Sequence, residues 1–409
     1  MHILFLTDNF PPEVNAPASR TYEHAREWVA AGHQVTIVTC VPNFPQGKVY
    51  QGYRNKVWQM NEMDGIKVIR VWSFITANEG FIKRILDYQS FMVSSFLASL
   101  VLRKIDVVVG TSPQFFTVCA AWAVATIKRK PFVFELRDIW PESVRAVGAM
   151  KESRVLDLLE KVEVFLYRRA TRIISVTHSF KRTLIERGID GEKIDVITNG
   201  VDSKRFVPMT KDAELVAELD VSGCFVAGYI GTHGMAHALD TLLDAAVILQ
   251  NDVNAQGIRL MFLGDGANRD ALISRAEQLG LSNVVFRASV PKEQVQRYWS
   301  VLDVSIIHLR KNELFKTVIP SKMFECMGMG LPILLGVEGE SAEIVQRTGV
   351  GVSFPPEDGA ALAQSIKRLR DSPERLKSMA SAGEAGAVEY DRKVLAQRML
   401  LILAGLDKR

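Results

Sequence analysis

The chain has 409 residues, of which 48% are hydrophobic and 23% are charged, and its formal net charge is +4 at pH 7. This composition is that of a globular protein, and the length predicts two domains. Counting along the sequence, residues 1–200 carry 26 Lys and Arg against 20 Asp and Glu, a surplus too diffuse to predict a nucleic-acid interface. It suits an anionic membrane surface or a phosphate-bearing substrate better.

Short apolar segments alternate with helical segments along most of the chain. The N-terminal run is too short for a signal peptide and predicts the first strand instead. The predicted strands are His2–Leu6, Val35–Thr39, Val68–Val71, Val107–Gly110, Phe132–Leu136, Ile173–Val176 and Ile194–Ile197, then Phe225–Ile230, Arg259–Leu263, Val284–Phe286, Val304–Ile307, Pro332–Leu335 and Gly351–Ser353. Strands separated by helices of ten or more residues indicate an α/β fold with parallel, doubly wound sheets.

Turn residues from Thr198 to Asp202 interrupt this pattern and predict a domain boundary. We expect two Rossmann-like domains, residues 1–200 and 201–390, with a cleft between them. The last segment, 391–409, contains the apolar-periodic stretch Val394–Leu406, which predicts a helix that packs back on the first domain.

No apolar stretch is long enough to predict a membrane-spanning helix. The nearest approach is Phe91–Leu102, which is either a crossover helix or, with Phe81–Leu86 and the pair Arg103-Lys104, an amphipathic surface that rests on anionic lipid. The four cysteines lie far apart, in or beside apolar runs, which is typical of buried thiols in a reducing compartment. We therefore expect a cytoplasmic protein bound peripherally to a membrane.

Two glycine-rich turns in the second half follow predicted strands. Gly231-Thr232-His233-Gly234 and Gly264-Asp265-Gly266 stand at the carboxyl ends of strands, where open α/β sheets bind ligands. Glycine there lets the backbone approach a ligand at a helix N-terminus. Such turns also occur for steric reasons alone, so a purely structural interpretation stays open.

The segment Pro320–Val345 is the most informative part of the sequence. Ser321 and Lys322 begin a short helix that carries Glu325, and Gly339-Glu340 precede another helix after a buried strand. A cation beside free N–H groups suits a diphosphate, and a carboxylate suits the hydroxyls of a ribose. The alternative is a surface lysine and a glutamate favoured by the helix dipole.

In the first half, Arg137-Asp138-Ile139-Trp140 directly follows a predicted strand and could handle a substrate or form an ion pair that braces a loop. The proline-rich loop Asp8–Arg20 follows the first strand and should line the same cleft. His178, His233 and His308 lie at strand ends without metal-ligand spacing, and no Asp-x-Asp occurs, so we expect no metal site.

The whole chain resembles retaining glycosyltransferases of the GT-B fold, in the family-four group that builds bacterial O-antigen, capsule and exopolysaccharide. The branch that it resembles most contains colanic-acid-type and N-acetyl-L-fucosaminyl transferases. The matching segments are Phe10-Pro11-Pro12-Glu13 with Ala16 and Arg20, Gly32–Val35, Pro42–Pro45, Asp64–Ile66, Thr111–Pro113, Arg137–Glu142, Asn199–Asp202, Gly231–Gly234, Gly264–Gly266 and Pro320–Lys322.

This resemblance implies that the second domain binds a sugar nucleotide and the first domain binds the acceptor. Glu325 matches the second Glu of the family's Glu-x7-Glu motif, which holds the ribose, while Thr317 stands where the first Glu is usual. Thr232 stands at the position of the usual diphosphate-binding Arg, and the usual Lys is also missing, which leaves Lys322 as the candidate for that charge. Arg137 replaces the usual His, and Asp138 matches the Asp that follows it.

We expect transfer of a hexose-type residue from a UDP-sugar to a lipid-linked saccharide, with retention and without a metal ion. The expected catalytic residues are Asp138, Arg137, Lys322 and His178. The expected donor-site residues are Gly231, Thr232, His233, Gly234, Gly264, Asp265, Gly266, Ser289, Val290, Ser321, Lys322, Glu325, Gly339 and Glu340. The expected acceptor residues are Glu13, Asn15, Arg20 and Trp140. A UDP-sugar 2-epimerase and a non-catalytic member of a polysaccharide assembly complex remain the alternatives.

Overall fold

The computed structural model describes residues 1–44, 46–76, 81–112, 114–140, 154–291 and 293–406. The chain divides into two compact units, Met1–Thr198 with Arg392–Arg409, and Asn199–Asp391. The division lies in the segment where turn residues interrupt the strand pattern. Pro45, Pro113, Pro141 and Glu142, which belong to the motifs above, lie outside the described residues.

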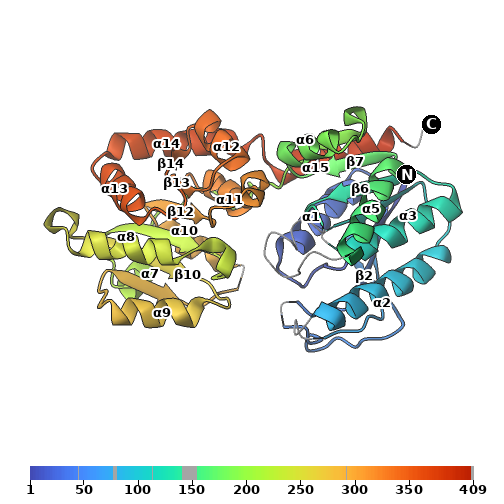
Figure 1. The fold of residues 1–409 in the computed structure, drawn as a ribbon, viewed down its shortest axis with the longest axis horizontal. Coiled ribbons are helices and arrows are strands. Elements are labelled where there is room, and N and C mark those ends of the chain that lie inside the picture. Colours follow the sequence, from blue (N-terminus) through green and yellow to red (C-terminus); the bar gives the residue numbers. More distant parts are fainter. Residues whose placement is uncertain (45, 77–80, 113, 141–153, 292, 407–409) are drawn as a thin grey trace. The chain divides into compact units, whose positions relative to one another are not determined.

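Unit 1 contains eight strands among its described residues (Figure 1). They are β1 His2–Leu6, β2 Gln34–Cys40, β3 Trp58–Met63, β4 Ile66–Val71, β5 Val107–Thr111, β6 Phe132–Leu136, β7 Arg172–Ser175 and β8 Ile194–Val196. The helices are α1 Ala16–Ala30, α2 Phe81–Leu100, α3 Phe115–Lys128, α5 Arg154–Arg169, α6 His178–Glu186 and α15 Arg392–Ala404. Ala16–Arg20, which we expected in a loop, form the first turn of α1, because Asn15 caps that helix and Pro17 suits its start.

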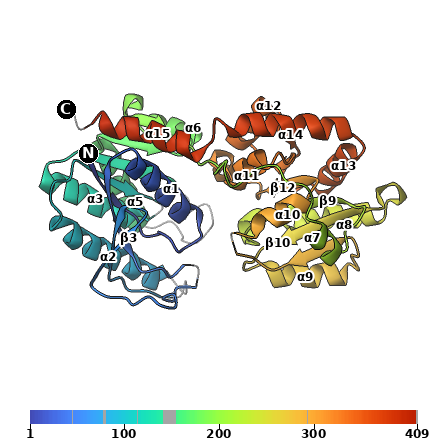
Figure 2. The ribbon, with the colours of Figure 1, turned by 180° about the vertical axis from the view of Figure 1, so that it is seen from behind.

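The strand order of the first sheet is β3-β4-β2-β1-β5-β6-β7-β8, and its strands from β4 to β8 are parallel. One core lies between the sheet and α2, α3, α5 and α6. The other lies between the sheet and α1 and α15, which run side by side in Figure 2. Trp28 of α1 is buried there and donates from Nε1 to the carbonyl oxygen of Ala396, 2.9 Å away. The C-terminal helix therefore completes the first unit.

The prediction of parallel sheets missed the strand β3, which pairs antiparallel with β4 at the edge of the first sheet. Its residues are mostly exposed, so no apolar run marks it in the sequence. The turn between β3 and β4 marks this hairpin in the sequence, because Asp64 and Gly65 have φ angles of 49° and 75°. An Asp-Gly pair with both φ angles positive is typical of a two-residue hairpin turn, so this short-range signal could have found the strand.

Unit 2 has a six-stranded parallel sheet in the order β11-β10-β9-β12-β13-β14. Its strands are β9 Phe225–Ile230, β10 Ile258–Leu263, β11 Val284–Arg287, β12 Val304–His308, β13 Ile333–Gly336 and β14 Gly351–Ser353. Its helices are α7 Ala213–Glu218, α8 Asp240–Gln250, α9 Arg269–Gln278, α10 Val295–Val301, α11 Lys322–Gly328, α12 Glu340–Thr348, α13 Gly359–Arg370 and α14 Pro373–Ala387. One core packs α8, α9 and α13 on the sheet, and the other packs α7, α10, α11 and α12 on it.

In both sheets the strand order reverses beside the first strand, between β1 and β5 and between β9 and β12. Loops leave in opposite directions at such a point, which opens a crevice at the carboxyl ends of the strands.

The four cysteines are free: Cys40 and Cys326 are buried, whereas Cys119 and Cys224 are only partly buried. Within the described residues, no helix combines the length and the apolar character that a membrane span requires.

Candidate functional site

The two glycine turns of unit 2 lie against each other at the carboxyl edge of its sheet. Gly231 follows β9 and donates its N–H to the carbonyl oxygen of Leu263, at the end of β10, over 2.9 Å. Gly264 has a φ of 151°, and a Cβ atom built on it would stand 1.8 Å from the carbonyl oxygen of Gly231. Any side chain there would therefore separate the turns, so the packing of the two turns by itself requires glycine at position 264.

His233 lies at the centre of these turns and is completely buried. Its N–H donates to the carbonyl oxygen of Asp265 over 2.8 Å, and its own carbonyl oxygen accepts from Asn268. Neither ring nitrogen has a hydrogen-bond partner among the described residues. Burial, helped by the charges of Arg269 and Lys322, lowers the pKa of His233 to about 4, so the ring is neutral at pH 7.

Lys322 brings a cation to the same place from the first turn of α11. Its Nζ is buried, lies 3.8 Å from the centroid of the Tyr229 ring, and has no hydrogen-bond partner among the described residues. A Cβ on Gly231 would stand 2.6 Å from this nitrogen, so the ammonium lies directly beside the first glycine turn. Burial lowers the pKa of Lys322 to about 8, with Cys326 and Glu325 opposing the shift.

A buried ammonium without an acceptor is costly unless a ligand supplies one. Its surroundings contain the neutral ring of His233 and the backbone of three glycines, which can come close to a bound group. An anion with several oxygen atoms, such as a diphosphate, would satisfy this nitrogen and the ring together. The structure thus brings together Lys322, His233, Gly231, Gly264 and Gly266 from separate segments of the sequence.

His308, at the end of β12, has a structural role. Its Nδ1 lies 2.8 Å from the carbonyl oxygen of His237, and its Nε2 accepts from the N–H of Glu357 over 2.9 Å. Both ring nitrogens are therefore used, and the ring stacks on Phe354. Sequence reasoning missed two residues near Lys322, Tyr229 and His237. The ring of Tyr229 lies under the ammonium of Lys322. Burial and the charge of Lys322 lower the pKa of His237 to about 4.

The remaining donor-site candidates lie on neighbouring segments of the same unit. Glu325 is half-buried in the first turn of α11, after Ser321, and Glu340 is buried at the start of α12. Gly339 has a φ of 76°, and a Cβ there would stand 2.1 Å from the carbonyl oxygen of Lys316. Thr317, at the position of the family's usual first Glu, donates from its hydroxyl to the carbonyl oxygen of Leu314 and so closes its own turn.

Ser289 and Val290 follow β11, the edge strand of the sheet. Ser289 is exposed, and Val290 packs partly against the core. Thr232 accepts a 2.9 Å hydrogen bond from the Tyr229 hydroxyl through its carbonyl oxygen, and Asp265 accepts from the N–H of Gly266. Their role in binding a nucleotide stays a prediction.

In unit 1, the segment after β6 is held by Ser112, whose hydroxyl oxygen accepts from the backbone N–H groups of Arg137 and Asp138 at 2.8 and 3.2 Å. Arg137 has a buried Nη1 without a hydrogen-bond partner among the described residues. Burial lowers its pKa to about 10, against the opposing effect of Glu135. Trp140 stacks on Phe115 with the ring centroids 5.1 Å apart, which gives it a packing role.

Arg20 donates hydrogen bonds from all three of its guanidinium nitrogens to oxygen atoms of unit 1. Nε donates to Glu135 Oε1 over 2.9 Å, Nη2 to the carbonyl oxygen of Ile197 over 2.9 Å and Nη1 to that of Thr198 over 2.5 Å. Burial would raise the pKa of Glu135, but the charges of Arg20 and Arg137 lower it below its ordinary value. These contacts brace the sheet, and an additional acceptor role for Arg20 stays a prediction.

The loop after β1 contains two carboxyl groups, that of the buried Glu13 and that of the partly buried Asp8. Glu13 Oε1 accepts from the N–H groups of Asn43 and Phe44 at 2.7 and 2.9 Å, and burial raises the pKa of Glu13 to about 7. Asp8, missed by sequence reasoning, accepts from the side chain of Gln114, and burial raises its pKa to about 6. Asn15 caps α1 by accepting from the N–H of Ala18, so part of its side chain is already used.

His178 is exposed as the first residue of α6, after the N-cap Thr177. His178 belongs to unit 1, and its catalytic role stays a prediction. Among the described residues no group of three or more His, Cys, Asp and Glu side chains is arranged to hold a metal ion.

The fold and this site define a class of protein: two Rossmann-like domains, the second with glycine-rich turns at the carboxyl edge of its sheet, which is the GT-B architecture. Residues 15–200 match the glycosyl transferase 4-like domain, and residues 224–372 match the glycosyl transferases group 1 family. The chain is a GT-B glycosyltransferase with these two domains in this order.

Three similar proteins illustrate this relationship. The chain is 25% identical over 384 residues to the putative colanic acid biosynthesis glycosyl transferase WcaI of Escherichia coli K12, covering 90% of this chain and 92% of that protein. It is 25% identical over 286 residues to the probable glycosyltransferase WbjE of Pseudomonas aeruginosa, covering 69% and 70%. The crystal structure of Anabaena Alr3699/HepE with UDP and glucose has the same fold, with a TM-score of 0.73, 18% identity and 99% coverage of both chains.

Proposed function

We propose that this glycosyltransferase moves a sugar from a UDP-sugar to a saccharide acceptor in bacterial surface polysaccharide synthesis. The observation that carries the proposal is the buried ammonium of Lys322, which lies without a hydrogen-bond partner among the described residues beside Gly231 and His233. The name of WcaI, a colanic acid biosynthesis enzyme, supports the polysaccharide context. The UDP and glucose in the Anabaena structure support the choice of donor.

In the proposed mechanism, the leaving diphosphate binds the glycine turns of unit 2. Negative charge grows on the diphosphate as the glycosidic bond breaks, and Lys322 stabilises that charge from a fixed position. The backbone N–H groups of the turns and the first turn of α11 add further donors. No metal ligand set is required for this arrangement, because the protein itself supplies the cation.

Glu325 is proposed to bind the ribose hydroxyls from the first turn of α11, and Ala288–Val290 to bind the base. Asn15, Arg137 and Asp138 in unit 1 are proposed to position the acceptor, with Glu13, Arg20 and Trp140 supporting that surface. Transfer would proceed with retention at the anomeric carbon, and the departing phosphate would take the proton of the acceptor hydroxyl. N-acetyl-L-fucosamine is the proposed sugar, and a lipid-linked saccharide on the cytoplasmic face of the inner membrane is the proposed acceptor.

The test measures turnover of a labelled UDP-sugar by Lys322→Ala and Glu325→Ala variants. Each substitution should lower turnover tenfold or more, because each removes a contact to the leaving nucleotide. Lys377→Ala is the matched control, since Lys377 is an exposed lysine of α14 paired with Glu374. Near-normal rates in both site variants would rule out this site.

The same assay separates the alternatives. Conversion of the UDP-sugar in the absence of an acceptor would indicate an epimerase. Absence of any measurable UDP binding would indicate a non-catalytic protein. NMR of the product's anomeric proton tests retention, and addition of a chelator tests independence from metal ions.

A further inference from the structure

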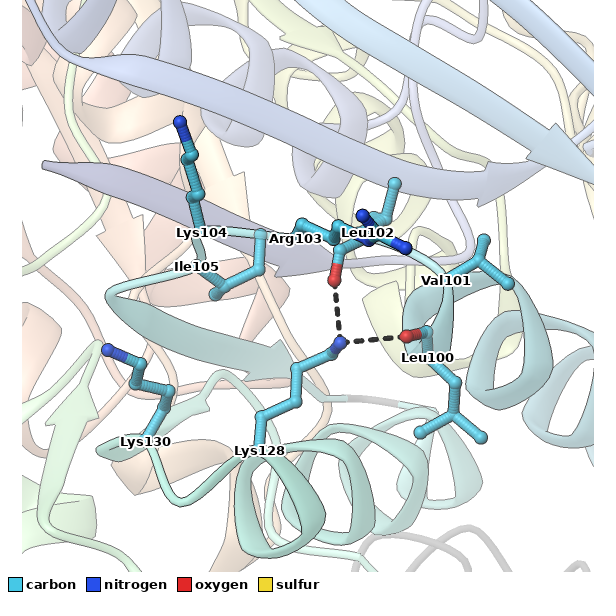
Figure 3. Close-up of a pocket in the computed structure, with 8 residues that line it drawn as sticks. All are labelled: Leu100, Val101, Leu102, Arg103, Lys104, Ile105, Lys128 and Lys130. Carbon is cyan, nitrogen blue, oxygen red and sulfur yellow. Dashed lines mark hydrogen bonds between the residues drawn. The ribbon is translucent and has the colours of Figure 1, made fainter.

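A basic hollow lies at the edge of unit 1 opposite to the candidate acceptor residues. It has a volume of about 500 Å³ and is lined by Leu100, Val101, Leu102, Arg103, Lys104, Ile105, Lys128 and Lys130 (Figure 3). Leu100 ends α2, residues 101–105 lead from α2 to β5, Lys128 ends α3, and Lys130 precedes β6, so the hollow stands at the amino ends of the strands. Ligands of open α/β sheets bind at the carboxyl ends, so the donor and acceptor chemistry does not explain this hollow.

The charge of the hollow is positive. Four of its eight described lining residues are basic and none is acidic. Lys128 Nζ donates to the carbonyl oxygens of Leu100 and Leu102 at 2.9 and 2.6 Å, which covers the negative C-terminal end of α2. Lys130 Nζ lies 3.9 Å from Asp106, a long and exposed ion pair that is worth little in water. Arg103 and Lys104 are both exposed.

An apolar stripe on α2 leads to this hollow. Leu86, Val93 and Leu97, with Val101 one residue beyond the helix, are 48%, 50%, 58% and 67% exposed. Their spacing of seven and then four residues puts them on one face of the helix. The opposite face of α2 is buried in the core through Phe91 and Ala98. The side chains of Phe81, Ile82 and Arg84, which the sequence also suggested for a lipid-binding surface, lie outside the described ones.

The stripe and the basic hollow together fit one kind of partner. A protein partner of ordinary composition could cover the apolar stripe. It would not explain why the hollow at the end of the stripe is lined by four basic residues and no acidic one. An anionic membrane matches both, because apolar side chains enter the headgroup boundary while Lys and Arg bind lipid phosphates. The helices α2 and α3 together contain a single acidic residue, Asp87, so little opposes approach to a negative surface.

We propose that the basic hollow and the apolar stripe form a membrane-binding surface, with the phosphate of an anionic phospholipid in the hollow and α2 flat on the bilayer. This inference rests on the proposed function, because it places the enzyme where a lipid-linked acceptor would lie. The 20 residues of α2 span about 30 Å and run from the carboxyl edge of the sheet to its amino edge. A flat α2 therefore brings the acceptor edge of unit 1 to the membrane as well.

The experiment measures sedimentation of the full chain with vesicles of phosphatidylcholine alone or with roughly one third phosphatidylglycerol. The wild-type protein should bind the anionic vesicles and release them as salt rises. The variant Arg103→Glu/Lys104→Glu should bind them at least tenfold more weakly, since each basic residue near such a surface contributes about fivefold in affinity. Leu97→Ser/Val101→Ser should weaken binding several-fold, mainly the part that persists at high salt.

The matched control is Arg368→Glu/Arg375→Glu, which makes the same change of charge on exposed residues of α13 and α14 in unit 2. It should change vesicle binding by less than about twofold. Equal losses in the two double variants, or equal wild-type binding to neutral and anionic vesicles, would overturn the proposal. If the charge reversal prevents folding, Arg103→Gln/Lys104→Gln should still show an intermediate loss.

UDP binding, measured by calorimetry, separates this inference from the proposed function. Arg103→Glu/Lys104→Glu should bind UDP as the wild type does, because the glycine turns and Lys322 lie in the other unit. Loss of vesicle binding with unchanged UDP binding supports the membrane surface. A wild-type protein that binds UDP but ignores anionic vesicles would refute the membrane surface alone.

Discussion

Arg20 in unit 1 and Lys322 in unit 2 are both cations near the carboxyl edge of a parallel sheet, but their surroundings differ. The three nitrogens of the Arg20 guanidinium each donate to an oxygen of unit 1. The ammonium of Lys322 is buried against the Tyr229 ring and has no such oxygen among the described residues. A buried cation whose nitrogens all donate to the protein stabilises the fold, whereas one without acceptors is suited to bind a ligand.

The largest expected effect follows from removing the guanidinium of Arg20. Arg20→Leu should lower the free energy of unfolding of unit 1 by roughly 3–5 kcal/mol, because it removes the guanidinium that is hydrogen-bonded to the buried carboxylate of Glu135. Urea denaturation followed by tryptophan fluorescence measures this loss, since five of the six tryptophans, Trp28 among them, belong to unit 1.

The double variant Arg20→Leu/Glu135→Leu serves as the control. It removes both charges of the hydrogen-bonded pair, so part of the lost stability should return, while the buried Arg137 loses the nearby carboxylate of Glu135. A loss below about 1 kcal/mol in the single variant would contradict the structural role assigned to Arg20.

The second prediction concerns the pH dependence of UDP binding at Lys322. With a pKa of about 8 in the free protein, Lys322 is charged at pH 7 and mostly neutral at pH 9. If its charge binds the diphosphate, the affinity for UDP should fall about tenfold between these pH values. Calorimetric titration at several pH values measures the change.

Lys322→Met provides the reference for that measurement. It should bind UDP weakly and with little change between pH 7 and 9, since the titrating group is gone. The same steep decline in wild type and variant would assign the pH dependence to another group and weaken the diphosphate role of Lys322.

The smallest expected effect is on stability, and it has the opposite sign to that of Arg20→Leu. The pKa of Lys322 is about 8 in the fold, below its ordinary value of 10.5, so the folded state binds its proton less well than the unfolded state. Wild-type stability should therefore rise between about pH 8 and 10.5. At pH 7, Lys322→Met should stabilise unit 2 by up to about 1 kcal/mol, reduced by loss of the contact with Tyr229.

Thermal unfolding at pH 7 and pH 10 tests this sign. The gain from Lys322→Met should be larger at pH 7 than at pH 10. A clear destabilisation at pH 7 would mean that Lys322, like Arg20, mainly supports the fold.

Much of the architecture could be predicted from local patterns. Buried parallel strands are continuous apolar runs, and the helices between them are long enough for crossovers, so every parallel strand lies within two residues of its predicted bounds. The strand β3 has no apolar run because it is an exposed edge, and only its Asp64-Gly65 turn could have revealed it. The start of α1 was likewise encoded in Asn15 and Pro17, although the prolines before them suggested a loop.

By itself, the sequence determined the fold class, the two sheets and the chemistry available at their carboxyl edges, because these follow from hydrophobic period and turn residues that act over short distances. Only the tertiary structure decided which polar groups are already satisfied. It gives Arg20 partners more than a hundred residues away, whereas nitrogens of Lys322 and His233 beside the glycine turns have no hydrogen-bond partner in the part of the chain that the structure describes. The physical reason is that satisfaction of a buried charge depends on long-range packing, which no local pattern records.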